Sequence, residues 1–197
     1  MSFIDRFISF TCDLSLTERD MYERARRKLP RHEREEPRHF YAKVIAAWYL
    51  HQPGLTVASE PVDDHTPRLS VLAPEGHYEL WADVGEASSR RLRAASRLRP
   101  QPEIFHFFYQ DDHLAPLLTV LRGSTENWVE RIHFLKLDPT LLDHLIEHET
   151  TSQQWSFTMP DDQTLYLAVD GVFLESSITR VSIWEAFQKS LHEAAAL

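Results

Sequence analysis

Three acidic residues stand where the sequence could support metal chemistry. From Tyr78 to Gly85, apolar and polar side chains alternate as in a strand, which places Glu79 and Asp83 on one face. Glu36 stands directly before Pro37, at the start of a segment with helical spacing. Carboxylate oxygens are the ligands that Mg²⁺ and Mn²⁺ prefer, and such an ion activates water and clamps a phosphodiester. One hypothesis is therefore a site that cleaves phosphodiesters.

The spacing of the two strand carboxylates limits this hypothesis. At roughly 3.3 Å per residue, Glu79 and Asp83 lie about 13 Å apart, which is too far for both to hold one ion. A metal site would need other ligands, such as Glu36, beside one of them. The alternative requires no function: Glu36 stabilises the start of its helix electrostatically, and Glu79 and Asp83 face solvent.

Basic residues gather in two segments, although the chain of 197 residues carries a formal net charge of −9. A net anion is repelled by phosphates unless its basic residues share one surface. The first segment contains Arg24, Arg26, Arg27, Lys28, Arg31, Arg34 and Arg38, and the second contains Arg90, Arg91, Arg93, Arg97 and Arg99. These segments keep nucleic acid open as a ligand, and solvated faces are the alternative interpretation.

Hydrophobic periodicity predicts the elements that position these residues. Residues 3–15 alternate as a strand, whereas residues 16–30 fit either a basic helix or a partner strand. An amphipathic helix begins at Pro37 and ends before Pro53. The elements expected after it are strands at 55–59, 68–72 and 77–84, a helix at 87–98, strands at 104–109 and 131–137, a helix at 139–149, and strands at 153–159, 164–169, 172–176 and 179–184, with Asp170-Gly171 as a hairpin turn.

Length and composition favour one domain over residues 1–197, of a mixed α/β (α+β) class with a central mixed sheet flanked by helices. Cys12 is the only cysteine, which indicates a reducing compartment. The N-terminal residues 1–16 lack a charged leader, and no stretch is apolar enough to span a membrane. We therefore expect a cytoplasmic protein without membrane contact. The sequence does not indicate an oligomeric state.

Three segments carry a resemblance to a known family. The run Glu36–Trp48, the strand Glu79–Gly85 and the run Arg90–Arg93 resemble the YaeQ family, and the likeness spans most of the chain, with only Phe187–Leu197 additional. The YaeQ family is similar in fold to PD-(D/E)xK nucleases. The resemblance thus implies a restriction-endonuclease-like core of helix, three strands, helix and strand, the order predicted between residues 36 and 109, with additional C-terminal strands.

The resemblance also implies roles for the acidic residues. Glu36 and Asp83 correspond to the metal-binding acids of the nucleases, with Mg²⁺ or Mn²⁺ as cofactor, and Glu79 assists as a neighbouring carboxylate. Two positions depart from the pattern. Arg68 stands where an acidic ligand is usual, and Gly85 stands where the nuclease lysine would be.

Arginines take the remaining roles that the resemblance implies. Arg93 substitutes imperfectly for a lysine that the YaeQ pattern places in the following helix, because arginine binds phosphate well but transfers protons poorly. The residues expected to contact nucleic acid are Arg68, Arg90, Arg91 and Arg97.

Two hypotheses follow. The first is a degenerate nuclease-like protein that binds a nucleic acid or a protein and needs no cofactor; the second is a nuclease or phosphodiesterase that depends on a divalent metal. The loss of the central acid and of the lysine favours the first. Salt bridges from Arg68 to Glu36 or Asp83 would favour it further, since they would fill the cleft that a metal needs.

Overall fold

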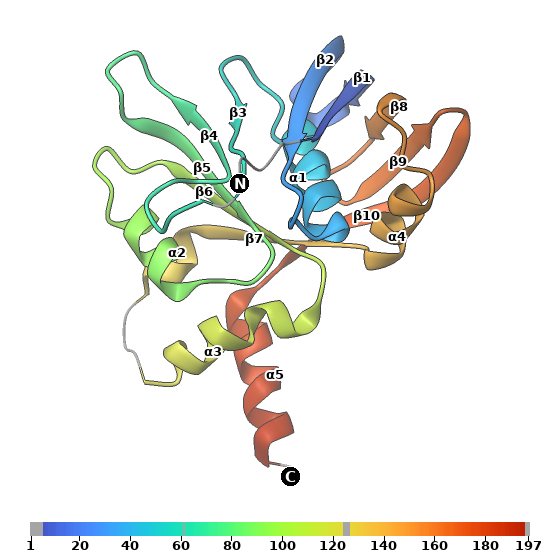
Figure 1. Ribbon diagram of the computed structural model, residues 1–197. Helices are drawn as coiled ribbons and strands as arrows, with labels where there is room; N and C mark the ends of the chain where they lie inside the picture. The colour runs from blue at the N-terminus through green and yellow to red at the C-terminus, as the bar shows by residue number, and fades with distance from the viewer. Residues whose placement is uncertain (1–5, 61, 124–126, 196–197) are drawn as a thin grey trace.

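The computed structural model describes residues 6–60, 62–123 and 127–195, which form one ten-stranded sheet and five α-helices (Figure 1). The order of strands in the sheet is β2-β1-β8-β9-β10-β7-β6-β5-β4-β3. The strands are β1 (Arg6–Leu16), β2 (Met21–Arg31), β3 (Thr56–Val57), β4 (Leu69–Leu72), β5 (Tyr78–Val84), β6 (Glu103–Phe108), β7 (Ile132–Leu137), β8 (Ser152–Met159), β9 (Thr164–Val169) and β10 (Val172–Val181). The helices are α1 (Pro37–Tyr49), α2 (Ser89–Ser96), α3 (Ala115–Leu121), α4 (Pro139–Glu147) and α5 (Ile183–Ala195), with short 3₁₀ turns η1 (Thr17–Arg19), η2 (Asp111–Leu114) and η3 (Trp128–Arg131).

The sheet is mixed, which confirms the expected α+β class. β1 pairs with β8, β5 with β6, and β6 with β7 in parallel, and the other neighbouring strands are antiparallel. The sheet is larger than the predicted core, because the β1–β8 pairing joins the N-terminal hairpin to the C-terminal strands. In the described part of the chain, no helix is long and apolar enough to cross a membrane.

Helix α1 lies inside the curl of this sheet (Figure 1). All residues from Phe40 to Trp48 are buried, because α1 packs against strands from both halves of the sheet. A helix surrounded in this way is apolar on nearly every side. The two ends of the sheet approach each other, and Arg27 of β2 donates a hydrogen bond of 3.2 Å to the carbonyl of Leu55, just before β3.

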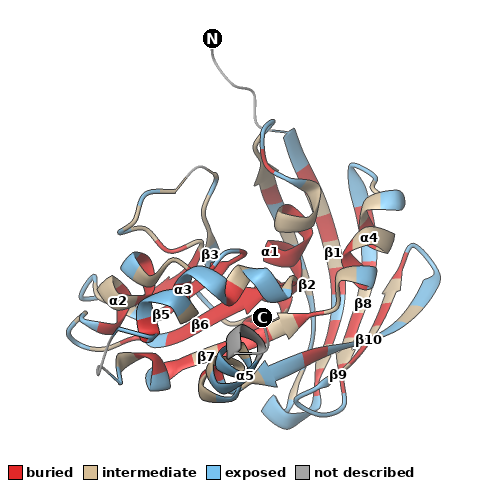
Figure 2. Ribbon diagram, turned by 90° about the horizontal axis from the view of Figure 1, so that it is seen from below, coloured by how far each residue is buried: buried red, intermediate tan, exposed pale blue. Residues whose placement is uncertain are grey.

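The outer face of the sheet is covered on one half only. Trp81, Leu92, Leu117 and Ile183 belong to a second apolar cluster, in which α2, α3 and α5 cover β5, β6 and β7. Along β1, buried and more exposed residues alternate, and Figure 2 shows them as alternating red and paler bands. The outward side chains of this half therefore remain accessible to a ligand.

Three expectations needed correction. Residues 21–31 form a strand, so the helical alternative for 16–30 is wrong there. The segments 172–176 and 179–184 are not two strands: β10 runs unbroken to Val181, pairing first with β9 and then with β7, and α5 follows. Helices α3 and α5 were not predicted.

The elements α1, β3, β4, β5, α2 and β6 occur in the order that the sequence predicts. Asp170 and Gly171 form the expected hairpin turn, with positive φ angles of 48° and 89°. Side chains of the loop between β3 and β4 connect the beginning of α1 to the end of β5, and the end of β5 bonds directly to the beginning of α2. This junction contains the candidate site.

Candidate functional site

Asp83 lies near the end of β5 and is 2% exposed. Arg91 of α2 holds both of its carboxylate oxygens, with Nη2 2.5 Å from Oδ1 and Nε 3.3 Å from Oδ2. The indole Nε1 of Trp81 donates a further hydrogen bond of 3.2 Å to Oδ2. The alternative that Asp83 faces solvent is therefore wrong, because α2 covers this end of the strand.

Arg68 also contacts Asp83. Its Nη1 lies 3.4 Å from Asp83 Oδ1, and its Nε donates a hydrogen bond of 2.7 Å to Oε1 of Glu60. Arg68 thus bridges two carboxylates. Its salt bridge with Asp83 is one of the two that the sequence analysis named as filling the cleft.

A buried lysine extends the same set of contacts. Lys43 of α1 is 1% exposed, and its Nζ lies 2.6 Å from Oε1 of Glu35 and 3.9 Å from Oε1 of Glu60. Glu35 precedes α1 and is itself buried. Because charges removed from water must be neutralised locally, each group constrains the position of the next.

These contacts form a continuous series of alternating charges, which we call the six-charge network. Its members in order of contact are Glu35, Lys43, Glu60, Arg68, Asp83 and Arg91. Three carboxylates and three cations give a formal charge of zero. The network links the segment before α1, α1 itself, the loop between β3 and β4, β5 and α2.

The network keeps Glu60 and Asp83 ionised. Burial raises the pKa of Glu60, but the hydrogen bond to His39 and the charges of Arg68 and Lys43 outweigh it and lower the pKa to about 2. Burial also raises the pKa of Asp83, and the hydrogen bonds and charge of Arg91, with the charge of Arg68, outweigh it, so its pKa is lowered. Both groups are anions at neutral pH.

A cavity of about 600 Å³ opens above part of the network, lined by residues of the segment before α1, of α1 and of the β3–β4 loop. Glu36 lines it but is exposed, and its carboxylate accepts a hydrogen bond of 3.3 Å from the hydroxyl of Tyr109. Ligand atoms of Glu35, His39 and Glu60 lie within 4.8 Å of one another. The cluster has the geometry for a cation, but its carboxylates already contact Lys43 and Arg68.

The structure brings together only some of the residues predicted from the sequence. Arg68 and Arg91 meet at Asp83, whereas Glu79 is exposed at the other end of β5. Arg93 does not join them: its guanidinium lies over the ring of Trp128, with 5.5 Å between Cζ and the ring centroid.

Two further arginines lie on the surface. Arg90 is exposed and forms a salt bridge of 3.1 Å with Asp64. Arg97 is exposed at the end of α2.

Sequence reasoning did not identify Glu35, Lys43 or Glu60. Lys43 carried a recognisable signal, since it is the one charged residue between Phe40 and Trp48 in an apolar helix. Such a residue is rarely buried without a partner. Glu60 carried no comparable signal, because its loop reaches Lys43 only through the tertiary fold.

Gly85 and His106 form the other side of the junction. Gly85 has φ +91°, and a Cβ at this position would lie 3.0 Å from Nδ1 of His39. His106 is completely buried, and its Nε2 lies 3.0 Å from the carbonyl oxygen of Gly85. Burial lowers the pKa of His106 to about 4, although Asp83 opposes this shift. His106 is therefore neutral at pH 7 and donates to Gly85.

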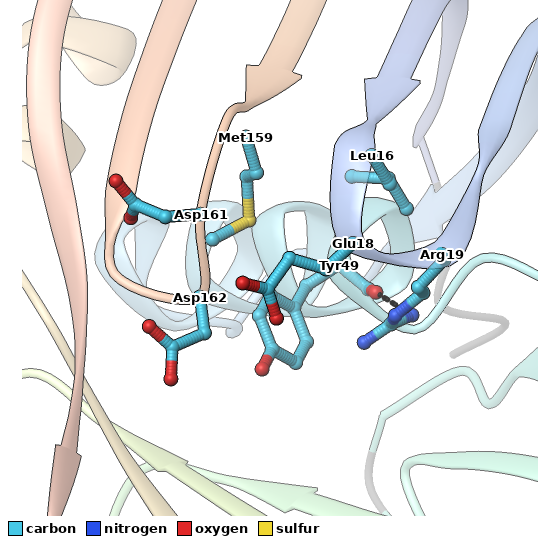
Figure 3. A pocket seen from close by; sticks show the side chains of 7 residues that line it. All are labelled: Leu16, Glu18, Arg19, Tyr49, Met159, Asp161 and Asp162. Carbon is cyan, nitrogen blue, oxygen red and sulfur yellow. Dashed lines mark hydrogen bonds between the residues drawn. The ribbon is translucent and has the colours of Figure 1, made fainter.

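A smaller hollow of about 190 Å³ lies beside the C-terminal ends of β1 and α1 and the turn between β8 and β9 (Figure 3). Arg19 donates a hydrogen bond of 2.5 Å to the carbonyl of Tyr49 and stacks on its ring. Asp161 accepts hydrogen bonds from the backbone of Gln163 and Thr164, as in a polar turn. These contacts explain the residues around the hollow without a ligand.

A second group with metal-binding geometry lies on α4. Ligand atoms of His144, Glu147 and His148 lie within 4.8 Å of one another, and the two imidazole centroids are 4.4 Å apart. Side chains spaced three and four residues apart always meet on a helix face. The sequence interpretation of the two histidines as a helix face therefore accounts for the arrangement.

The curled mixed sheet around a buried helix, with a network of alternating charges at its junction, defines an α+β class of protein. A family model described as YaeQ protein matches residues 1–178, so the chain belongs to the YaeQ family. The match ends before the residues that the sequence analysis marked as additional. The function of this family is not established by these comparisons.

Solved structures share the fold. A YaeQ protein from Xanthomonas axonopodis pv. citri is 14% identical, with a TM-score of 0.78, over 90% of this chain and 98% of that one. A YaeQ protein from Pseudomonas syringae is 17% identical, with a TM-score of 0.75, over 90% of this chain and 96% of that one. No curated protein matches the chain.

The substitution Arg91→Ala will strongly destabilise the protein. It leaves Asp83 buried with only Arg68 as a cationic partner and removes hydrogen bonds to the carbonyls of Asp63 and Thr66. Loss of one partner from a buried pair costs about 3–5 kcal/mol. Urea unfolding measures this cost, and Arg90→Ala is the matched control, with an expected change within about 0.5 kcal/mol. Equal effects of the two substitutions would contradict a structural role for Arg91.

Acid will destabilise the protein through His106. A histidine whose folded pKa is lowered contributes stability that is complete above its unfolded pKa of 6.5 and is lost as pH falls to about 4. This loss amounts to roughly 3 kcal/mol. The groups that face His106 include Asp83, Arg68 and His113.

The measurement is the free energy of unfolding of the wild type and of His106→Gln between pH 7 and pH 4. The neutral glutamine amide retains a donor for Gly85, so the variant should show a shallower slope in this window. Parallel slopes for both proteins would show that His106 does not titrate as described.

Proposed function

We propose that this YaeQ-family protein is a nuclease-like protein that no longer hydrolyses phosphodiesters and acts by binding single-stranded nucleic acid. The observation that carries the proposal is that Asp83 is buried and bonded to two arginines. The order of helix, three strands, helix and strand from α1 to β6 supports descent from a PD-(D/E)xK core.

The residues present do not fit a divalent metal. Oxygen atoms of Asp83, Glu60 and Glu35 already lie within 2.5–2.7 Å of arginine or lysine nitrogens. A divalent ion would give the neutral six-charge network a formal charge of +2. Cationic neighbours at such distances oppose binding of a second cation.

The position of the nuclease lysine is also closed. Gly85 stands there by resemblance, and its positive φ and the 3.0 Å approach to His39 disfavour any larger residue. A lysine at this position would have to displace the histidine. The carboxylates of the network are held by cations, and position 85 does not accept a lysine, which supports binding without turnover.

The accessible half of the sheet supplies a surface for a nucleic acid. Along β2, Tyr22, Arg24, Arg26 and Lys28 pair with the outward residues of β1, so they lie on the outer face. Residues paired across two strands share a face. We call this row of β2 the basic outer face.

The chemistry of this surface favours a single strand over a protein. Tyr22 is 61% exposed, and outward hydroxyl side chains on β1 and β8 lie beside the row. Nucleic-acid bases stack on exposed aromatic rings, and a row of cations follows the phosphate backbone. A ligand of this kind fits the cytoplasmic location expected from the sequence.

We expect labelled single-stranded RNA to bind without being cleaved. The protein is incubated with single- and double-stranded RNA and DNA, with and without Mn²⁺, and both binding and products are measured. The variant Arg24→Gln/Arg26→Gln/Lys28→Gln should weaken single-strand binding and lower the slope of log K against log salt by about 2, since each phosphate contact contributes about 0.7.

Arg122→Gln is the matched control, because Arg122 is an exposed arginine on the other half of the molecule. Manganese-dependent cleavage that disappears in Asp83→Asn would instead establish the metal nuclease. Absence of nucleic-acid binding, with capture of a defined protein partner, would replace the ligand class proposed above.

A further inference from the structure

We infer that a pocket between the end of α2 and η3 binds a phosphate group. The residues lining it are Arg93, Ser96, Arg97, Arg99, Asn127, Trp128 and Arg131, around a volume of about 280 Å³. We call it the arginine pocket. It shares no residue with the basic outer face or with the six-charge network, although Arg91 of the network lies on the same helix, so the inference does not depend on the proposed function.

Three of the four arginines have no carboxylate beside them. Among the described residues, neither Arg97, Arg99 nor Arg131 has an acidic oxygen within 4.0 Å. Arg99 donates to the carbonyl of Leu98 at 2.7 Å, and Arg131 donates to Oε1 of Gln101 at 2.6 Å. Both acceptors are neutral, so among the described residues no carboxylate neutralises Arg97, Arg99 or Arg131 at short range.

Four arginines line this one small pocket. The chain carries a net charge of −9, and arginines such as Arg6, Arg38 and Arg90 each contact a carboxylate. Like charges gathered in a small space repel one another, and a bound anion reduces that repulsion. The arginine pocket is therefore electrostatically complementary to an anion.

The shape of the donors favours phosphate. Guanidinium groups present planar pairs of N–H donors that match phosphate oxygens, and several of them around one small space suit a compact group with several oxygens. The hydroxyl of Ser96 is not available, since it donates to the carbonyl of Arg93 at 2.8 Å. The arginines are the main donors that the pocket presents.

Trp128 forms a rigid wall of the pocket and supplies a fluorescence signal for binding. The guanidinium of Arg93 lies over its ring, which fixes the ring against α2. A phosphate bound to the neighbouring arginines changes the electrostatic environment of this indole. Binding should therefore alter tryptophan fluorescence.

The test is a titration of the protein with inorganic pyrophosphate, in which calorimetry and tryptophan fluorescence detect binding. Sulfate is the reference anion. We expect pyrophosphate to bind with micromolar affinity, at least tenfold more tightly than sulfate. Arg97→Gln/Arg131→Gln should weaken pyrophosphate binding at least tenfold, and Trp128→Phe should remove the fluorescence change while calorimetry still detects binding. Both arginines are exposed, so the double variant should keep its fold, which circular dichroism checks.

The matched control is Arg24→Gln/Arg26→Gln, which removes two exposed arginines from the basic outer face and should change pyrophosphate affinity less than twofold.

Competition with 5′-phosphorylated and 5′-hydroxyl RNA identifies the source of the phosphate. Displacement of pyrophosphate only by the phosphorylated strand indicates a nucleic-acid end, and displacement by neither strand indicates a small phosphorylated molecule. No pyrophosphate binding at millimolar concentration, or equal losses in both double variants, would overturn the inference. Neither result bears on single-strand binding by the basic outer face.

Discussion

The part of the fold around α1 depends on neutralising charges that water barely reaches. Removing an ion from water costs several kcal/mol even after relaxation, so each buried carboxylate needs a cation at short range. Lys43, in the middle of an apolar helix, is compatible with the core only because Glu35 lies 2.6 Å away. Arg91 holds Asp83 and also binds the carbonyls of Asp63 and Thr66, so the loop before β4 is fixed by the same network.

The proposed loss of hydrolysis rests on this constraint. A metal centre keeps carboxylates close together without cationic partners. Their mutual repulsion destabilises the fold, and metal binding offsets this loss of stability. Here Arg68 and Arg91 form salt bridges with Asp83, and the close approach of His39 to Gly85 disfavours a lysine at position 85. The two ligand surfaces proposed above, the basic outer face and the arginine pocket, lie outside this neutral network.

Local patterns predicted the elements well where the residues follow one period. The helix from Pro37 and the strand ending at Val84 are examples, because their large apolar residues follow helical and strand spacing, although both elements are buried on more than one face. Two strands were predicted where β10 is continuous, because β10 changes partner at Ile178 without a break. The sequence showed no turn residue there, and it did not predict α5 beyond Val181.

The site was predicted only in part, for physical reasons that differ between residues. Asp83 was identified from strand alternation, but its partners come from distant segments that a single sequence does not connect. Arg91 shares the buried face of α2 with Leu92 and Ala95, whereas Arg93 points toward Trp128, and the helical period distinguishes them only once the start of α2 is known. The basic run of β2 divides between the two faces of a strand, with Arg27 partly buried and Arg26 exposed, so neighbours in sequence do not form one surface.

The most direct test of the account is the free energy of unfolding of Asp83→Asn, measured in a chelating buffer beside Glu79→Gln, an exposed carboxylate on the same strand. If Asp83 serves the six-charge network, the amide leaves Arg91 and Arg68 without a counter-charge. The variant should then lose about 3 kcal/mol of stability, while the control stays within about 0.5 kcal/mol of the wild type. An unchanged or higher stability of Asp83→Asn would contradict the account, because removing one acid from a metal centre relieves repulsion instead of breaking a salt bridge.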